Sequence, residues 1–362
     1  SHVAVRFAPY DVWLRGMMPC APASPICAGL MRFSTTLASA LTQDLARPFV
    51  FEGRACRCGA SIGVASTQLT TVDALLTNSD IALYKAKNAG RAQVGLFDRR
   101  DLETLRETKS LADDILRGLE AGEFVPFFQP QVDAKTGDMI GMEALARWDH
   151  PTRGILTPDV FLSVATDLNV AAELDRSIFE HAIQRCETAF AAWPRRPSLS
   201  FNVSATRISS ADVEDIARLA TQYSGGVAFE LLETIFLEEE NAEFLFQLDR
   251  LRELGISIEI DDFGSGRASV VALQRIAPDR IKIDRRLVAP MHESQSGMQL
   301  LRSITEIGLA LDIGVTAEGV ETKAQAEELA ILGCDRLQGY FFAKPMGLQD
   351  VLNTVVWPTR AG

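Results

Sequence analysis

The feature that most constrains the fold of this chain is a series of short apolar segments that alternates with amphipathic segments after residue 124. The apolar segments, which we interpret as strands, span residues 124–129, 139–147, 198–204, 227–232, 256–261, 280–284, 313–318 and 335–340. Most are separated by segments with helical periodicity, at residues 171–192, 209–223, 240–254, 294–311 and 322–332. Alternating strands and helices favour a parallel sheet, and eight such units predict a closed barrel of the triosephosphate-isomerase type.

The first two strands differ from the others because only a short turn, residues 133–138, joins them. A turn of this length connects antiparallel strands, whereas parallel strands need a longer crossover. We therefore expect an α/β fold, a modified (β/α)8 barrel with an antiparallel first strand. The active site of such a barrel lies at the carboxyl ends of its strands.

Polar side chains stand at or near the ends of most of these strands. They are Glu143, Asn202, Glu230, Asp261, Asp262, Lys282 and Glu318. Carboxylates gathered at one barrel mouth would repel one another strongly unless cations were bound between them. The adjacent pair Asp261-Asp262 is suited to hold two metal ions, and two metal ions suit the hydrolysis of a phosphodiester.

Lys282 and Glu318 complete the predicted site. The lysine supplies positive charge for a phosphate or an attacking hydroxide, and the glutamate can accept the proton of a water molecule. A purely structural alternative exists for each residue: Asp261-Asp262 could cap a turn, and Glu318 could cap the helix near Thr322. These alternatives leave the repeated placement of an acid at the strand ends unexplained.

The composition excludes several other classes of protein. A net charge of −12 argues against a surface for polymeric nucleic acid, although bound cations would still permit an anionic ligand. No stretch approaches the roughly 20 unbroken apolar residues of a membrane span. Six cysteines without a paired framework indicate reduced thiols in a cytoplasmic protein, with any sensory or membrane-anchoring part upstream of Ser1. Four histidines, none three or four residues apart, favour an oxygen-rich site for magnesium or manganese.

The amino-terminal third of the chain has a different pattern. Residues 1–31 show no clear periodicity and are left unassigned. The following residues predict, in order, a helix, a hairpin, a second helix that ends before Gly90, and a charged connecting helix, at residues 37–45, 49–64, 71–89 and 99–120.

The residues at the predicted strand ends also carry a family resemblance. From about residue 108 to residue 357 the chain resembles the EAL-type cyclic di-GMP phosphodiesterases. The matching motifs are Phe128-Gln129-Pro130-Gln131-Val132, Glu143-Ala144-Leu145-Ala146-Arg147-Trp148, Asn202-Val203-Ser204, Asp261-Asp262-Phe263-Gly264-Ser265-Gly266, Lys282-Ile283-Asp284, Ala317-Glu318-Gly319-Val320-Glu321-Thr322 and Gln338-Gly339-Tyr340. The resemblance implies hydrolysis of cyclic di-GMP to linear pGpG in bacterial second-messenger signalling. It also implies two Mg²⁺ or Mn²⁺ ions per active site and a homodimer formed through this domain.

The resemblance further implies roles for individual residues. The implied metal ligands are Glu143, Asn202, Glu230, Asp261 and Asp262, with Asp261 shared between the two ions. Lys282 would orient the attacking water, Glu318 would be the general base, and Glu321 would support the site. Contacts to the dinucleotide would come from Gln129, Leu145, Arg147 and Gln338. Glu233 would anchor the loop after Asp262 at the dimer interface, where the chain departs from the usual family pattern at Leu232 and Arg267.

Residues 61–65 and 79–91 resemble the closing part of a GGDEF diguanylate cyclase domain, which makes residues 32–98 a partial, degenerate segment of that kind. The Gly-Gly-Asp-Glu-Phe signature is absent from the sequence, so we expect no cyclase activity. Half of such a sheet would expose an unpaired edge.

Two alternatives to an enzyme remain at this point. One is a catalytically silent receptor that binds cyclic di-GMP and acts through a partner protein, and the other is a scaffold that binds no nucleotide. Degenerate receptors of this family typically lose metal ligands, whereas every implied ligand is present in this sequence. The sequence therefore favours the enzyme.

Overall fold

The computed structural model describes residues 2–8, 12–17, 25–51, 54–66, 74–208, 213–238, 241–264, 270–293 and 295–354. The chain divides into two compact units, Ser1–Asp113 and Asp114–Gly362, and each has its own main sheet. Among the described helices, none combines the length and the apolar character that crossing a membrane requires.

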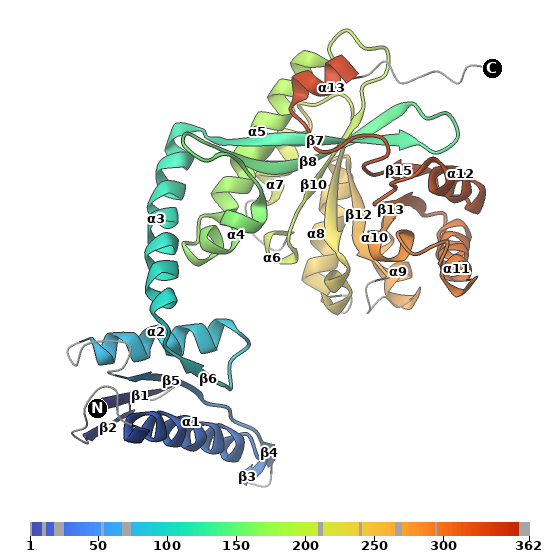
Figure 1. The fold of residues 1–362 in the computed structure, drawn as a ribbon. Coiled ribbons are helices and arrows are strands. Elements are labelled where there is room, and N and C mark those ends of the chain that lie inside the picture. Colours follow the sequence, from blue (N-terminus) through green and yellow to red (C-terminus); the bar gives the residue numbers. More distant parts are fainter. Residues whose placement is uncertain are drawn as a thin grey trace. The chain divides into compact units, whose positions relative to one another are not determined.

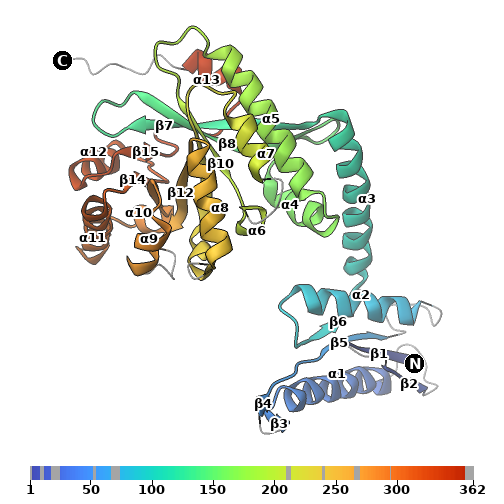
Figure 2. The ribbon, with the colours of Figure 1, turned by 180° about the vertical axis from the view of Figure 1, so that it is seen from behind.

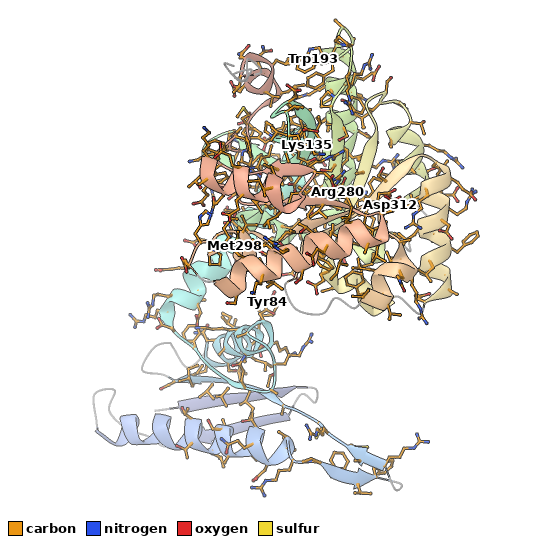
Figure 3. All side chains as sticks on the ribbon, turned by 90° about the vertical axis from the view of Figure 1, so that its right-hand side faces the viewer. Tyr84, Lys135, Trp193, Arg280, Met298 and Asp312 are labelled. Carbon is orange, nitrogen blue, oxygen red and sulfur yellow. The ribbon has the colours of Figure 1, made fainter. Side chains whose placement is uncertain are left out.

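The first unit contains a four-stranded sheet in the order β2-β1-β5-β6 (Figure 1). Its strands are β1 (His2–Ala8), β2 (Val12–Met17), β5 (Ser61–Ser66) and β6 (Val94–Leu96). The sheet lies between helix α1 (Pro25–Leu45) and helix α2 (Leu75–Asn88) (Figure 3). Gly63 on β5 permits close packing of α2, because a Cβ at this position would lie 2.0 Å from Ser79 O.

The sequence pattern of the first unit predicted its helices better than its strands. The hairpin predicted at residues 49–64 is shorter in the structure: β3 (Phe49–Phe51) and β4 (Arg54–Cys56) form a separate two-stranded sheet, and residues 61–64 belong to β5 of the main sheet. Strand β5, which half a sheet would leave unpaired, has β1 on one side and β6 on the other. The unpaired edge that we expected at β5 is therefore absent among the described residues. The two strands that pair with β5 lie in parts of the sequence for which no structure was predicted.

Helix α3 (Arg99–Ala121) leads into the second unit, which is a closed barrel of eight strands. The barrel strands are β7 (Phe124–Asp133), β8 (Met139–His150), β10 (Ser198–Asn202), β11 (Val227–Leu232), β12 (Ile256–Phe263), β13 (Arg280–Ile283), β14 (Gly314–Ala317) and β15 (Arg336–Gln338). The sheet order runs from β10 through β15 to β7 and β8, and the pairing of β8 with β10 closes the ring. Strand β7 runs antiparallel to both of its neighbours, and the other pairs in the ring are parallel. These findings confirm the predicted barrel and its antiparallel first strand.

Helices cover the outside of the barrel (Figure 2). They are α4 (Pro158–Asp167), α5 (Ala171–Ala189), α6 (Ala205–Ile208), α7 (Val213–Ala220), α8 (Ala242–Glu253), α9 (Val270–Ile276), α10 (Arg285–Val288), α11 (Gln295–Leu311), α12 (Lys323–Leu332) and α13 (Leu348–Thr354), with the 3-10 helix η1 (Glu233–Glu238) and the short outer strand β9 (Gly154–Leu156). Side-chain caps define the starts of several of these helices, α8 and α12 among them. Asn241 accepts hydrogen bonds from two backbone N–H groups of α8, and Thr322 forms a capping box with Gln325 at α12.

The barrel strands separate apolar from polar residues by alternation, because successive side chains point to opposite faces of a strand. On β11, β12 and β13 one set of positions belongs to the hydrophobic core: Phe229, Leu231, Ile258, Ile260, Ile281 and Ile283. The alternate positions carry buried polar side chains: Glu230, Glu259 and Lys282. The interior of this barrel is therefore polar, whereas branched apolar residues commonly fill such barrels.

Candidate active site

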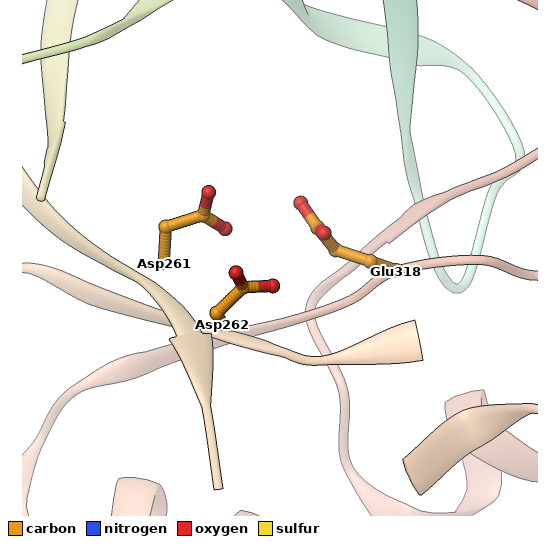
Figure 4. Close-up of side chains that lie close together, drawn as sticks. All are labelled: Asp261, Asp262 and Glu318. Atoms are coloured by element: carbon orange, nitrogen blue, oxygen red, sulfur yellow. The ribbon is translucent and has the colours of Figure 1, made fainter. Parts of the chain in front are cut away.

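The carboxyl end of β12 presents two adjacent carboxylates to the same space. In a regular strand Asp261 and Asp262 would point to opposite faces. Here the pairing of β12 with β13 shifts register between Ile260 and Phe263, and Asp262 has a φ of 54°, in the left-handed region. As a result, oxygens of Asp261, Asp262 and Glu318 lie within 4.8 Å of one another (Figure 4).

Glu318 reaches this cluster from the loop after β14. Its backbone N–H donates to Ile283 O at 3.2 Å, which extends the pairing with β13 beyond the end of the strand. Gly319 follows with a φ of 65°, and a Cβ at this position would lie 2.4 Å from Arg285 Cβ. The turn that carries Glu318 therefore requires a glycine.

Lys282 is fully buried, with its ammonium group among four carboxylates. Its Nζ lies 2.6 Å from Glu318 Oε1 and 2.8 Å from Glu230 Oε2. It also lies 3.4 Å from both Glu143 Oε2 and Asp261 Oδ1. Burial acts to lower the pKa of this lysine, but the four carboxylates raise its pKa well above the ordinary value. Lys282 is therefore charged and neutralises part of the cluster.

The glutamates around Lys282 differ in pKa. Burial raises the pKa of Glu230 well above its usual range, and the charge of Glu143 adds to this effect. Burial also raises the pKa of Glu318, to about 8, against the opposing charge of Lys282. At Glu143 the effect of burial is overcome by Lys282 and by two amide hydrogen bonds, so that its pKa is lowered. The raised pKa values show that burial and the neighbouring carboxylates disfavour the ionised forms of Glu230 and Glu318, and a bound cation would offset this effect.

Three amide side chains lie around Glu143. Asn202 Nδ2, at the end of β10, donates to Glu143 Oε1 at 2.8 Å, and Gln338 Nε2, at the end of β15, donates to Glu143 Oε2 at 2.6 Å. Gln338 Nε2 also donates to Gln129 Oε1 at 3.1 Å, and Gln129 lies opposite Glu143 in the register of β7 and β8. The structure thus brings three of the predicted site residues together with Glu143.

Leu145 and Arg147 follow Glu143 along β8, on the same face of the strand because side chains alternate. Both residues are half-buried. The Arg147 guanidinium donates to Ala146 O at 2.7 Å and lies 5.7 Å from the centre of the Phe127 ring. Within the described residues, no hydrogen bond or ion pair joins Leu145 or Arg147 to the carboxylate cluster.

Two predicted residues remain, Glu233 and Glu321. Glu233 is buried at the first position of η1. In the loop that it was predicted to anchor, residues 263–267, residues 265–267 lie outside the described residues. Glu321 is exposed, and its backbone N–H donates to Gln325 Oε1 at 2.9 Å at the start of α12. No hydrogen bond or ion pair links the Glu321 carboxylate to the cluster in the described ranges.

The donor set of the cluster fits a hard divalent cation. Candidate ligand atoms in the cluster are all oxygens, which favours Mg²⁺ or Mn²⁺ over zinc. Among the described residues, no donor faces Glu230 Oε1, whereas Glu230 Oε2 and Asp261 Oδ1 lie 2.8 and 3.4 Å from the ammonium of Lys282. Buried carboxylate oxygens without a donor are unfavourable, and a bound cation would satisfy them.

A second layer of buried or half-buried polar residues, which was not predicted from the sequence, lies beneath this cluster. Its members are Gln131, Ser200, Glu259, Arg280, Thr316 and Arg336. A sequence signal for several of them did exist, because residues two positions apart share one face of a strand. Glu259, Arg280 and Arg336 each precede a predicted site residue by two positions.

The eight-stranded barrel with an acidic mouth defines a class of proteins, and comparison with known families identifies it. The family model described as "EAL domain" matches residues 112–345. The chain belongs to the EAL domain family.

Similar proteins include signalling proteins of bacteria. The bifunctional diguanylate cyclase/cyclic di-GMP phosphodiesterase MucR of Pseudomonas aeruginosa is 30% identical over 328 residues, which are 89% of this chain and 48% of that protein. An uncharacterized signaling protein of Caulobacter vibrioides is 34% identical over 316 residues, which are 85% of this chain and 38% of that protein. The chain thus spans about half or less of the length of these relatives.

A solved structure of the MucR phosphodiesterase in complex with c-di-GMP has the same fold. It aligns with a TM-score of 0.62 and 30% sequence identity, and the alignment covers 67% of this chain and 99% of that one. An EAL domain protein from Listeria monocytogenes aligns with a TM-score of 0.60 and 27% identity over 67% of this chain.

Proposed function

We propose that this chain is a metal-dependent phosphodiesterase that hydrolyses cyclic di-GMP to linear pGpG. The observation that carries the proposal is the convergence of four carboxylates on the buried Lys282, with Asp262 beside two of them, at the mouth of an EAL-family barrel. The names of the relatives support the substrate: MucR is named for a cyclic di-GMP phosphodiesterase activity, and its matched structure contains c-di-GMP.

The proposed metal ligands are oxygens of five residues at the strand ends: Glu143, Asn202, Glu230, Asp261 and Asp262. Asp261 and Asp262 are suited to two ions because the bulge in β12 directs both carboxylates to the same space. When bound, Mg²⁺ or Mn²⁺ lowers the pKa of water and offsets the negative charge of the phosphate.

Glu318 is the proposed general base. In the reaction a water oxygen forms a bond to phosphorus, and the bond from phosphorus to the ribose 3′ oxygen breaks. Glu318 accepts the proton of the water, and the leaving oxygen takes up a proton to become a hydroxyl group. Burial raises the pKa of Glu318 to about 8, which suits a carboxylate that accepts a proton near neutral pH. Lys282, at 2.6 Å, orients Glu318 and balances its charge.

Other residues are proposed to bind the dinucleotide or to support the site. Arg147 supplies a positive charge on the same face of β8 as Glu143, and Leu145 lies between them. Gln338 donates hydrogen bonds to both Gln129 and Glu143. Gln129 and Gln338 can therefore support the proposed metal ligand Glu143 as well as contact the nucleotide. Glu321 is proposed as a supporting residue, at the start of α12.

Incubation of the purified chain with cyclic di-GMP and Mg²⁺, followed by chromatography, tests the proposal. The account predicts that linear pGpG accumulates. Saturable binding of cyclic di-GMP without product would instead identify a receptor, and the absence of both would identify a scaffold.

Dimer formation and the role of Glu233 are proposed on the family resemblance. Glu233 is buried at the start of η1, directly after β11, which carries the proposed ligand Glu230. We expect Glu233→Ala to weaken metal binding although Glu233 does not touch the metal. Metal titrations of both proteins over a range of protein concentrations test this expectation, and equal affinities with a rate per molecule independent of concentration would contradict it.

A further inference from the structure

A chain of hydrogen bonds crosses the barrel interior from an arginine to a proposed metal ligand. Arg336 Nη1 donates to Gln131 Oε1 at 3.3 Å, and Gln131 Nε2 donates to Gln338 Oε1 at 3.0 Å. Gln338 Nε2 then donates to Glu143 Oε2 at 2.6 Å. Gln131, Gln338 and Glu143 are only 1%, 3% and 6% exposed, so bulk water is not available to replace these bonds.

The groups at the two ends of this series of hydrogen bonds determine which atom donates and which accepts at each link. A guanidinium has donors and no acceptor, so Arg336 favours the oxygen of the Gln131 amide. The amide nitrogen of Gln131 then faces Gln338 and donates to the amide oxygen of Gln338. Gln338 consequently directs its nitrogen toward Glu143, an ionised carboxylate that only accepts. Every link has a donor facing an acceptor.

The fold holds Gln131, which is central to this series of hydrogen bonds, in place. Gln131 on β7 lies directly opposite Gln338 on β15 and opposite Gly141 on β8. A Cβ at Gly141 would lie 2.8 Å from Gln131 Oε1 and 2.7 Å from Ser198 Oγ. The absence of a side chain at Gly141 therefore makes room for the Gln131 amide.

We propose that Gln131 is a positioning residue for the metal site. Arg336 sets the orientation of the Gln131 amide, the Gln131 amide sets that of the Gln338 amide, and the Gln338 amide in turn holds the carboxylate of Glu143 in place. This inference rests on the proposed function, because it matters only if Glu143 binds a metal ion. If the amide of Gln338 turned over, its oxygen would face Glu143 Oε2 in place of a donor, and the two acceptors would repel. Glu143 would then leave the orientation that the other ligands require.

The Gln131→Glu variant tests the donor and acceptor order of these hydrogen bonds. A carboxylate at this position still accepts from Arg336 but, when ionised, has no proton to donate to Gln338. The new charge lies beside Arg336, so the variant is expected to fold. Loss of a group that orients a metal ligand typically weakens metal binding by about 10–100-fold. We expect a loss of this size for Gln131→Glu, and a smaller one for Gln131→Met, which has similar length and neither donates nor accepts strongly.

Arg336→Met and Arg280→Met form a matched pair of controls. Both arginines lie 3.6 Å from the same oxygen of Glu259, but a hydrogen bond to Gln131 is found only for Arg336 among the described residues. Metal affinity is expected to fall in Arg336→Met and to stay unchanged in Arg280→Met. Gly141→Ala, which crowds the Gln131 amide, is expected to weaken metal binding while Gln131, Gln338 and Glu143 all remain present.

The measurement is the binding of Mn²⁺ in the absence of nucleotide, with free Mn²⁺ detected by electron paramagnetic resonance, and with thermal unfolding as a check on folding. Weaker binding by Gln131→Glu than by Gln131→Met, in folded proteins, is the expected result. Equal Mn²⁺ affinity of Gln131→Glu and the unsubstituted protein would overturn the inference and leave the proposed function intact. If the unsubstituted protein bound no Mn²⁺, the proposed metal site itself would be wrong, and the inference would fail with it.

Discussion

Lys282 Nζ lies 2.6 Å from Glu318 Oε1 inside the barrel mouth, closer than to any of the other three carboxylates that surround it. The ammonium group thus joins the proposed general base to Glu230, Asp261 and Glu143. Lys282 lowers the pKa of Glu318, yet burial dominates and raises that pKa to about 8. Through the contact with Lys282, proton acceptance by Glu318 therefore depends on the charge of the whole cluster.

Lys282→Ala and Glu318→Gln are each expected to reduce kcat by about 10²–10⁴-fold while changing the affinity for cyclic di-GMP much less. The reason is that Glu318 is the proposed base for the attacking water and Lys282 orients Glu318, where charge develops in the transition state. Steady-state measurement of pGpG formation gives kcat and KM for each variant. A variant that raised KM and kept kcat would contradict the role assigned to its residue.

The pKa of Glu318 also predicts how the stability of the metal-free protein depends on pH. Its value of about 8 in the folded protein exceeds the ordinary 4.5, so the folded state binds a proton that the unfolded state has released between these values. The free energy of unfolding should therefore fall as pH rises from about 4.5 to about 8, by a few kcal/mol in order of magnitude.

Glu318→Gln is the matched variant for this effect, because an amide of the same size does not titrate. Denaturant unfolding of both proteins in chelator, at several pH values, measures the two slopes. The slope of the variant should be flatter. Equal slopes would show that Glu318 is not the group responsible.

The sequence predicted the barrel because its signals are local. Strands such as Ile258 to Asp261 and Ile281 to Asp284 end in charged residues, and each is followed by a helix. The hairpin turn at residues 133–138 predicted the antiparallel first strand. These patterns need no knowledge of distant contacts, and the structure confirms the fold that they indicated.

Two parts of the site could not be predicted in the same way. The bulge that turns Asp262 toward Asp261 depends on the register between β12 and β13, which a single strand does not reveal. The network of Gln131, Arg336 and Glu259 depends on which strands are neighbours, since each residue alone looks like an ordinary polar position of a strand. The same limit left β1 and β2 of the first unit unassigned.

The backbone of Asp262 leads to a separate prediction about stability. Its φ of 54° lies in the left-handed region, which disfavours residues with a Cβ by roughly 1–2 kcal/mol. Asp262→Gly and Asp262→Ala both remove the carboxylate, but only the glycine relieves this strain. Asp262→Gly should therefore be more stable than Asp262→Ala by about 1 kcal/mol in denaturant unfolding, after allowance for the greater freedom of glycine in the unfolded chain. Both variants should bind metal more weakly than the unsubstituted protein, and equal stability of the two would argue against strain at this residue.

The carboxylate cluster around Lys282 is proposed to bind a divalent cation and to hydrolyse cyclic di-GMP. The most direct test measures the rate of pGpG formation by the unsubstituted chain with Mg²⁺, by the same protein in excess chelator, and by Glu143→Ala with Mg²⁺. Glu143→Ala should remain folded, because Lys282 keeps three other carboxylates as partners and Glu230 loses a like charge beside it. Turnover is expected in the first case and none in the other two. Full activity in excess chelator, or an active Glu143→Ala protein, would contradict it.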